Sequence, residues 1–189
     1  MAISDHFRGK ALNAIDKKGR VSVPSDFRGV IQTRHRRVIA QDGFDPAEGD
    51  EGRHASAGKV VIVTRDRKRP CLIAFENQFV REYADKLSLR HAALAGQERE
   101  DAIQRDMEML GSTFDLAWDV NGRIVLGARL CQRIGVDPAA DNGRDNLVFF
   151  HGVGETFEIW NADRFIAEVE GRNPDLADDV RDMVEDRAK

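Results

Sequence analysis

The 189-residue sequence has only two cysteines, five prolines and one tyrosine, and none of its apolar runs approaches the roughly 18–20 residues needed to span a bilayer. Cys71 and Cys131 lie far apart and neither belongs to a CxxC pair, so neither a disulfide framework nor a cysteine-rich zinc site is expected. The first eight residues contain no apolar segment of the kind found in a secretory signal peptide. We therefore expect a cytoplasmic protein without a membrane segment.

Motifs for catalysis, metal binding and nucleotide binding are also missing. The five histidines form neither an HxxxH nor an HExxH pattern, and the sequence has no P-loop and no GxSxG. Gly152 and Gly154 lack the third glycine and the following helix of a dinucleotide-binding fingerprint, and a hairpin turn explains them better. Cys131 lies among apolar residues and is expected in the core rather than as a nucleophile. We expect no enzyme, no cofactor or metal, and no small-molecule substrate.

Charge is distributed unevenly along the chain. The whole sequence carries 29 basic and 33 acidic residues, for a net charge of −4. Residues 1–37 hold nine basic and only three acidic side chains, whereas residues 161–189 hold five basic and nine acidic ones. Local charge decides whether a surface can meet phosphate. The sequence thus excludes a uniformly basic coat and permits one basic face, although a solvated charged segment would give the same counts.

One motif occurs twice, at an offset of 103 residues. Residues 11–23 (ALNAIDKKGRVSV) align with residues 114–126 (FDLAWDVNGRIVL), and both contain Asp-x-x-Gly-Arg between two apolar runs. Each copy continues into a short amphipathic stretch, two apolar strands and a helix. This order predicts an α+β fold in which two copies of one β-rich unit are joined by helices.

The repeated motif is typical of a tight hairpin. Asp16 would accept backbone N–H groups of the turn, Gly19 would supply the positive φ that closes it, and Arg20 would pair with the aspartate from the return strand. The second copy has the same residue types at the same places: Asp119, Gly122 and Arg123. A hairpin with a local ion pair would explain a single copy. Because turn closure does not need the arginine, its repetition favours a functional role.

The remaining elements are predicted from apolar periodicity and from turn residues. Strands are expected over 60–63, 71–75, 147–150 and 157–160, and helices over 76–90, 94–110 and 162–170. The glycine-rich and acidic residues 42–58 are interpreted as an inserted loop. The acidic tail has a weak amphipathic pattern at residues 176–184, which fits either a helix packed on a neighbour or a solvated terminus.

The residues around both motifs resemble the MraZ family. The match includes Phe7-Arg8-Gly9, residues 16–24 (DKKGRVSVP) and residues 119–126, and it extends over roughly residues 7–170. The resemblance implies two tandem AbrB-like swapped-hairpin β-barrel repeats with pseudo-twofold symmetry, plus connecting and C-terminal helices. The expected units are a first repeat over 7–92, a linking helix over 93–110, a second repeat over 111–170 and an acidic tail over 171–189.

The same resemblance implies a function. It implies a bacterial transcriptional regulator, usually a repressor, that acts at the nucleoid on direct repeats in its own promoter, upstream of division and cell-wall genes. It also implies a homo-oligomeric ring, an octamer or larger. The residues expected to contact double-stranded DNA are Arg8, Lys10, Lys17, Lys18, Arg20 and Arg123. Those expected to orient them are Asp16, Gly19, Asp119 and Gly122. Arg20 is the first choice, because the first turn is more basic than the second.

Other classes of function stay open at this stage. An antitoxin-like regulator of the same fold is the nearest alternative, but such proteins usually have about half this length and one motif. A hydrolase or methyltransferase is disfavoured because the sequence carries no matching motif. A ring with a purely structural role would differ by showing no salt-dependent affinity for DNA.

Overall fold

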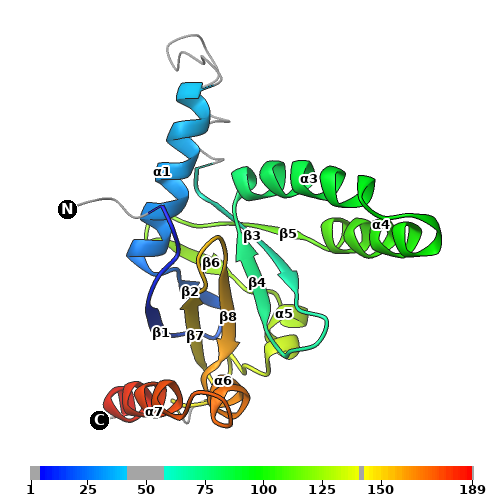
Figure 1. Ribbon diagram of the computed structural model, residues 1–189. Coiled ribbons are helices and arrows are strands. Elements are labelled where there is room, and N and C mark those ends of the chain that lie inside the picture. The colour runs from blue at the N-terminus through cyan, green and yellow to red at the C-terminus, as the bar shows by residue number, and fades with distance from the viewer. Residues whose placement is uncertain (1–4, 42–57, 141–142, 189) are drawn as a thin grey trace.

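The computed structural model describes residues 5–41, 58–140 and 143–188, and it has an α+β architecture (Figure 1). Its strands are β1 (Lys10–Ala14), β2 (Arg20–Ser22), β3 (Val60–Arg65), β4 (Leu72–Phe75), β5 (Phe114–Ala117), β6 (Arg123–Val125), β7 (Leu147–Gly152) and β8 (Phe157–Asn161). Its helices are α1 (Ser25–Gln41), α3 (Asn77–Ala92), α4 (Gly96–Gly111), α5 (Ala128–Ile134), α6 (Ala162–Val169) and α7 (Pro174–Ala188). Apart from Gly58, the insertion expected over 42–58 lies outside the described residues.

Strands from the two halves of the sequence are interleaved. Six strands form one antiparallel sheet in the order β1-β7-β8-β4-β3-β5, and β2 pairs with β6 as a separate two-stranded ribbon. The pairs β1–β7, β4–β8 and β2–β6 each join one strand from either half. The expected α+β class is therefore confirmed. The ladders of the described strands form an open sheet and a ribbon rather than a closed barrel, because β1 and β5 lie at the two sheet edges.

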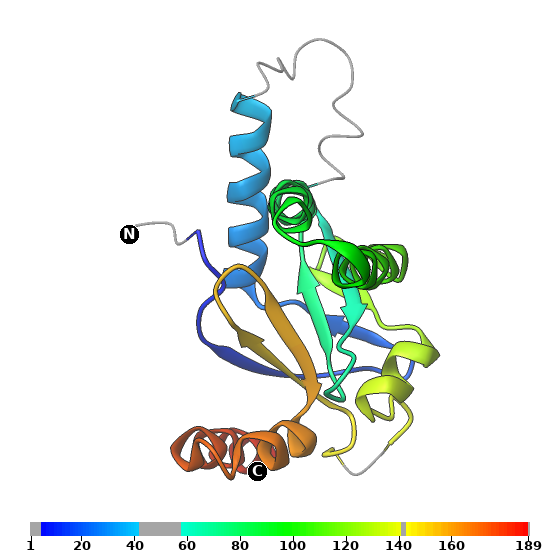
Figure 2. The ribbon, with the colours of Figure 1, turned by 45° about the vertical axis from the view of Figure 1, so that its right-hand side comes forward.

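The helices lie at different ends of the sheet. α6 and α7 pack together at the end that carries the C-terminus, whereas α3 and α4 form a hairpin that projects from the other side (Figure 1). The view turned by 45° keeps this separation, with α1 standing beside the α3–α4 hairpin (Figure 2). None of the described helices combines the length and the apolar character needed to cross a membrane.

Most elements lie where periodicity predicts them, but α1 is longer than expected. The sequence predicts a short amphipathic stretch over 24–31, and the helix continues to Gln41. The reason lies in Arg34, which is only 6% exposed. Its guanidinium donates to the carboxylates of Glu76 and Glu155, each at 3.2 Å, and to the backbone carbonyl of Asp5 at 2.8 Å. These charge-assisted bonds fix the second half of a helix that has little apolar surface of its own.

The acidic tail forms a packed helix. Ala177, Val180 and Val184 of α7 are buried in a cluster with residues of α6, β7 and β8. The helix is also tied to β1, because Lys10 donates to the carboxylate of Asp179. Of the two alternatives left by the sequence, the packed helix is correct and the solvated terminus is wrong.

Both cysteines are buried core residues, as expected for Cys131. Burial raises the pKa of the Cys71 thiol to about 12 and raises that of the Cys131 thiol above its ordinary value. Since the thiolate is the reactive form, we expect neither cysteine to react with a disulfide reagent at pH 8 while the protein is folded. Both should react after unfolding in guanidinium chloride. Rapid labelling of one thiol per native chain, counted by mass spectrometry, would contradict this placement.

Candidate nucleic-acid interface

The first motif forms the expected turn but not the expected hairpin, because the flanking strands β1 and β2 pair with β7 and β6 rather than with each other. One carboxylate oxygen of Asp16 accepts the backbone N–H of Lys18 at 2.9 Å and that of Arg20 at 3.0 Å. The other oxygen accepts the Arg20 guanidinium, with Nε and Nη2 each at 2.6 Å. The bond from the Arg20 backbone N–H is the largest of the effects that lower the pKa of Asp16. The turn therefore clamps its arginine side chain against its own aspartate.

The second motif repeats this arrangement bond for bond. Asp119 accepts the backbone N–H of Asn121 at 2.9 Å and that of Arg123 at 3.0 Å. The Arg123 guanidinium donates to the other oxygen from Nε at 2.9 Å and from Nη2 at 2.7 Å. Chiefly through the Arg123 side chain, the pKa of Asp119 falls to about 2. The clamp therefore supports folding above the ordinary carboxyl pKa of 3.8, and this support is lost as the pH falls towards 2.

The two turns meet through the β2–β6 ribbon. Arg20 lies opposite Val125, Val21 opposite Ile124, and Ser22 opposite Arg123. Two further bonds flank this ladder, from Leu126 N–H to the Gly19 carbonyl at 2.8 Å and from Val23 N–H to the Gly122 carbonyl at 2.9 Å. Each bond is the counterpart of the other at the repeat offset of 103. The ribbon therefore has an internal twofold pattern, with one turn at each end.

Both motif arginines lie on one face of this ribbon. Val21 and Ile124 are buried, and side chains alternate along a strand, so Arg20, Ser22, Arg123 and Val125 share the opposite, outward face. Arg20 and Arg123 are diagonal neighbours across the two strands, a relation that usually places side chains about 7–8 Å apart.

Each clamped arginine keeps one nitrogen that no described residue binds. Nε and Nη2 of Arg20 and of Arg123 bind the aspartates, and among the described residues nothing accepts from either Nη1. Both side chains are about one-third exposed. Two guanidiniums with a fixed orientation and a free outer edge are thus presented side by side.

The glycines of the two turns are required by the backbone. Gly19 has φ +75° and Gly122 has φ +73°, values that side-chain-bearing residues rarely adopt. A Cβ on Gly19 would lie 2.7 Å from the backbone oxygen of Leu126. A Cβ on Gly122 would overlap the side chain of Arg28. The expectation that these glycines shape the motif therefore has a direct steric basis in the structure.

The second turn has basic neighbours that belong to the first half of the chain. A groove of about 450 Å³ brings Arg8, Lys10 and Arg28 together with Asn121 at the tip of this turn. Arg28 is the residue that sequence reasoning missed, because nothing local places the first turn of α1 beside residue 122. The offset of 103 identifies the two turns as equivalent, but it does not say that β2 of one copy pairs with β6 of the other.

The other basic residues expected at the interface have different surroundings. Lys17 and Lys18 are exposed at the tip of the first turn, and Arg8 is exposed beside β1. Lys10 is half-buried and its ammonium group is engaged by Asp179 of α7. Arg20 and Arg123 therefore lie together on the ribbon, and further basic side chains lie near its ends. Of these, Lys10 is already engaged in an ion pair.

A third turn of the same kind joins β3 to β4 and serves as a comparison. Asp66 accepts the backbone N–H groups of Lys68 and Arg69 and binds the Arg69 guanidinium at 2.7 Å. Here Nη1 of the arginine also pairs with buried Glu158 at 2.7 Å, and the guanidinium lies 5.6 Å from the centre of the Trp160 ring. All outer nitrogens of this arginine are therefore used inside the protein. The ribbon arginines differ from it in keeping a free edge.

Comparison with known proteins gives several relatives with the same name. No family model matches the chain. The chain is similar to the transcriptional regulator MraZ of Ruegeria pomeroyi, with 30% identity over 155 residues that cover 82% of this chain and 77% of the relative. It is 29% identical over 177 residues to the transcriptional regulator MraZ of a Ruegeria species (strain TM1040), covering 92% of this chain and 90% of the relative. The transcriptional regulator MraZ of Rhodospirillum rubrum is 27% identical over 174 residues, with coverage of 92% and 90%.

Proposed function

The chain belongs to the MraZ family of transcriptional regulators, and we propose that it binds double-stranded DNA through the outward face of the β2–β6 ribbon. The observation that carries this proposal is the pair of clamped arginines, Arg20 and Arg123, which stand side by side on that face with a free guanidinium edge each. Within this proposal the protein is a regulator and not an enzyme.

The ribbon suits the major groove in size and in chemistry. That groove is wide enough to admit a two-stranded β-ribbon, and an arginine can bind the O6 and N7 atoms of guanine. Asp16 and Asp119 orient the guanidiniums before DNA arrives, so less side-chain entropy is lost on binding. Gly19 and Gly122 allow the turns that make this possible. In this mechanism the aspartates position the arginines and do not touch DNA.

The phosphate contacts come from the ends of the ribbon. Lys17 and Lys18 serve the first turn, and Arg8, Lys10 and Arg28 serve the second. Lys10 has to exchange Asp179 for phosphate in order to take part. Contacts of this type add affinity that depends on salt and carry no sequence information.

The halves of the chain are proposed to be AbrB-like swapped-hairpin repeats over 7–92 and 111–170, with 93–110 as the linking segment and 171–189 as the acidic tail. The matched bonds at the offset of 103 and the interleaved strand pairs support this assignment. Swapping of hairpins between repeats explains why the β2–β6 ladder takes one strand from each half.

The proposed assembly is a ring of identical chains, an octamer or larger, bound to direct repeats in the promoter of the chain's own gene. A single ribbon offers few contacts, but several ribbons on consecutive repeats bind together at high effective concentration. In this proposal the protein acts at the nucleoid in the cytoplasm and represses the division and cell-wall gene cluster.

The proposal is tested by titrating duplex DNA from the region upstream of the chain's own gene. We expect fluorescence anisotropy to report an affinity that falls at least roughly tenfold between about 50 and 200 mM salt, because counterions are released from phosphates. Native mass spectrometry of the same samples should give a multiple of the chain mass, with DNA added to it. A monomer with no affinity for this duplex at low salt would contradict the proposal.

A further inference from the structure

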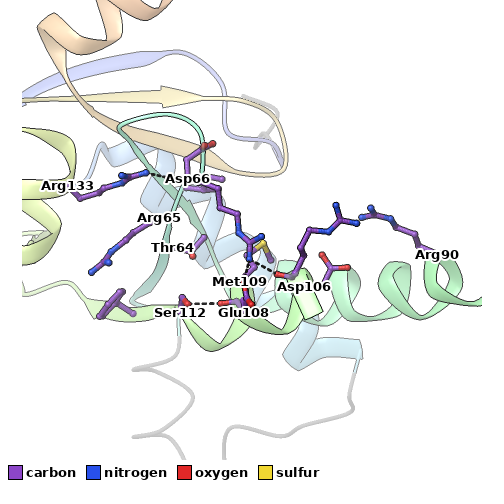
Figure 3. A pocket seen from close by; sticks show the side chains of 13 residues that line it. Thr64, Arg65, Asp66, Arg90, Asp106, Glu108, Met109, Ser112 and Arg133 are labelled. Atoms are coloured by element: carbon purple, nitrogen blue, oxygen red, sulfur yellow. Dashed lines mark hydrogen bonds and ion pairs between the residues drawn. The ribbon is translucent and has the colours of Figure 1, made fainter. Parts of the chain in front are cut away.

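A cleft of about 910 Å³ lies between the β3–β4 turn and the α3–α4 hairpin (Figure 3). It is lined by five arginines that come from β3, the turn, α3, α4 and α5: Arg65, Arg67, Arg90, Arg105 and Arg133. None of them belongs to the β2–β6 ribbon or to the basic residues around it. In Figure 3, Arg133 reaches the backbone of Asp66 on one side of the cleft, and Arg90 comes from α3 on the other.

The carboxylates of the cleft are already engaged. Asp66 is bound by Arg69, Asp106 by Tyr83 and His91, and Glu108 by Arg67. The bonds to Arg69 lower the pKa of Asp66 despite its partial burial, and the bonds to Gln104 and Arg67 lower that of Glu108. Asp66 and Glu108 therefore stay ionised and paired, and among the described residues Arg67 is the one lining arginine that pairs with a carboxylate.

The other four lining arginines differ from Arg67 in their contacts. Among the described residues, no carboxylate pairs with Arg65, Arg90, Arg105 or Arg133. Arg65 lies 5.8 Å from the centre of the Phe114 ring, and Arg105 donates only to a backbone carbonyl of its own helix. Arg133 binds the carbonyls of Asp66 and Arg69, while its buried Nε has no hydrogen-bond partner in the described segments. Five arginines thus face one concave space together with three carboxylates, and basic side chains outnumber acidic ones in its lining.

We propose that this cleft binds an oligophosphate chain, either free or carried by a nucleoside. Guanidinium is planar and always charged, and its forked donors match the oxygens of phosphate. The basic residues that line the cleft are arginines, and the described lining contains no lysine. A volume of about 910 Å³ is within the usual range for small-molecule sites. Ile73, Met109 and Phe114 supply apolar surface on which a nucleoside base can rest. This site is independent of the ribbon and of its contact with DNA.

A duplex does not fit the same cleft. DNA presents its phosphates on the outside of a wide, stiff rod, which cannot follow the walls of a cleft of about 910 Å³. A flexible chain of phosphates can enter the pocket and reach arginines on several walls. The charge and the concavity together therefore favour a small polyanion.

The test is isothermal titration of the full chain with sodium tripolyphosphate, ATP, GTP and inorganic phosphate at one ionic strength. We expect saturable binding of tripolyphosphate or of the nucleotides and much weaker binding of single phosphate. Tighter binding of the nucleotides than of tripolyphosphate would assign the nucleoside form, and the reverse order would assign the free chain.

Arg90→Ala with Arg105→Ala should weaken binding at least tenfold. The matched control is Arg99→Ala, an exposed arginine of α4 outside the cleft.

Three results of the phosphate and nucleotide titrations would overturn the proposal. The first is that no oligophosphate shows saturable binding. The second is that Arg99→Ala loses as much affinity for oligophosphate as the double variant does. The third is that Arg20→Ala loses this affinity, which would place the anion on the ribbon. A fourth readout is the affinity for upstream DNA, which should be unchanged in the double variant. If DNA binding fell as well, the cleft would belong to the DNA path and the proposal would be wrong. Should the double variant melt early, the single exposed change Arg90→Ala gives the same comparison.

Discussion

Arg20→Ala is expected to abolish specific binding to DNA from the chain's own upstream region while leaving the oligomer assembled. The side chain lies on the outward face of the ribbon, and within the described part of the chain its hydrogen bonds go to Asp16 of its own turn. Each arginine–guanine contact is worth about 1–3 kcal/mol of discrimination, and an oligomer makes several at once. Since every chain of the oligomer loses this contact, the losses of binding free energy add up over the whole oligomer. Electrophoretic mobility shift measures the binding, and native mass spectrometry measures the assembly.

Two control variants separate base recognition from charge. Arg20→Lys keeps the charge but loses the forked donor, so it should retain weak, salt-sensitive binding and lose preference for the upstream sequence. Arg99→Ala removes one exposed arginine from α4 and should bind like the unchanged protein. Arg123→Ala should resemble Arg20→Ala, since both occupy the same face. Unchanged affinity in Arg20→Ala would mean that the clamp serves only to close the turn.

Gly19→Ala is expected to destabilise the fold by about 1–3 kcal/mol, because a residue with a side chain has to be held in the left-handed region of φ that Gly19 occupies. The new methyl group would also lie 2.7 Å from a backbone oxygen of Leu126, which cannot rotate away as a side chain could. For a chain of this size, about 1 kcal/mol shifts the melting temperature by roughly 2–4 °C. Differential scanning calorimetry should therefore report a loss of several degrees.

A second glycine gives the matched control for this prediction. Gly29 lies inside α1, and a Cβ there would meet nothing within 4 Å. Gly29→Ala should raise stability by about 0.5–1 kcal/mol, because alanine favours the helix more than glycine does. Equal effects of the two substitutions would contradict the steric role assigned to Gly19.

The local part of the candidate site was predictable from the sequence. Asp16, Gly19 and Arg20 occupy positions dictated by the chemistry of one short turn, and a turn depends only on neighbouring residues. The same is true of the alternating apolar residues that form β2 and β6. The packed helix α7 was predicted as one of two alternatives, because its apolar residues recur at helical spacing on an acidic background.

The non-local part could not be predicted in the same way. Periodicity says that Val21 and Ile124 each lie on a buried strand face, but it does not say that these two strands pair with each other. Arg28 became part of the site only through that pairing. Similarly, the length of α1 depends on Arg34 and its carboxylate partners, which are distant in sequence.

The arginine cleft is a second example of structure that the sequence does not reveal. Its arginines are scattered from Arg65 to Arg133 with no repeated spacing, and each alone resembles a solvated surface charge. Only the folding of the α3–α4 hairpin against the β3–β4 turn brings them to one cavity (Figure 3). By contrast, the ribbon arginines could be predicted because each copy of the repeated motif has an arginine at the same place.

The central claim is tested most directly by placing a photo-crosslinking amino acid at Val125, which lies on the outward face of the ribbon opposite Arg20 and is 52% exposed. The control position is Leu89 of α3, which is 76% exposed and lies away from the ribbon. With duplex DNA from the upstream region, we predict a crosslink from position 125 that high salt suppresses, and none from position 89. Crosslinks from position 89 alone would contradict the account.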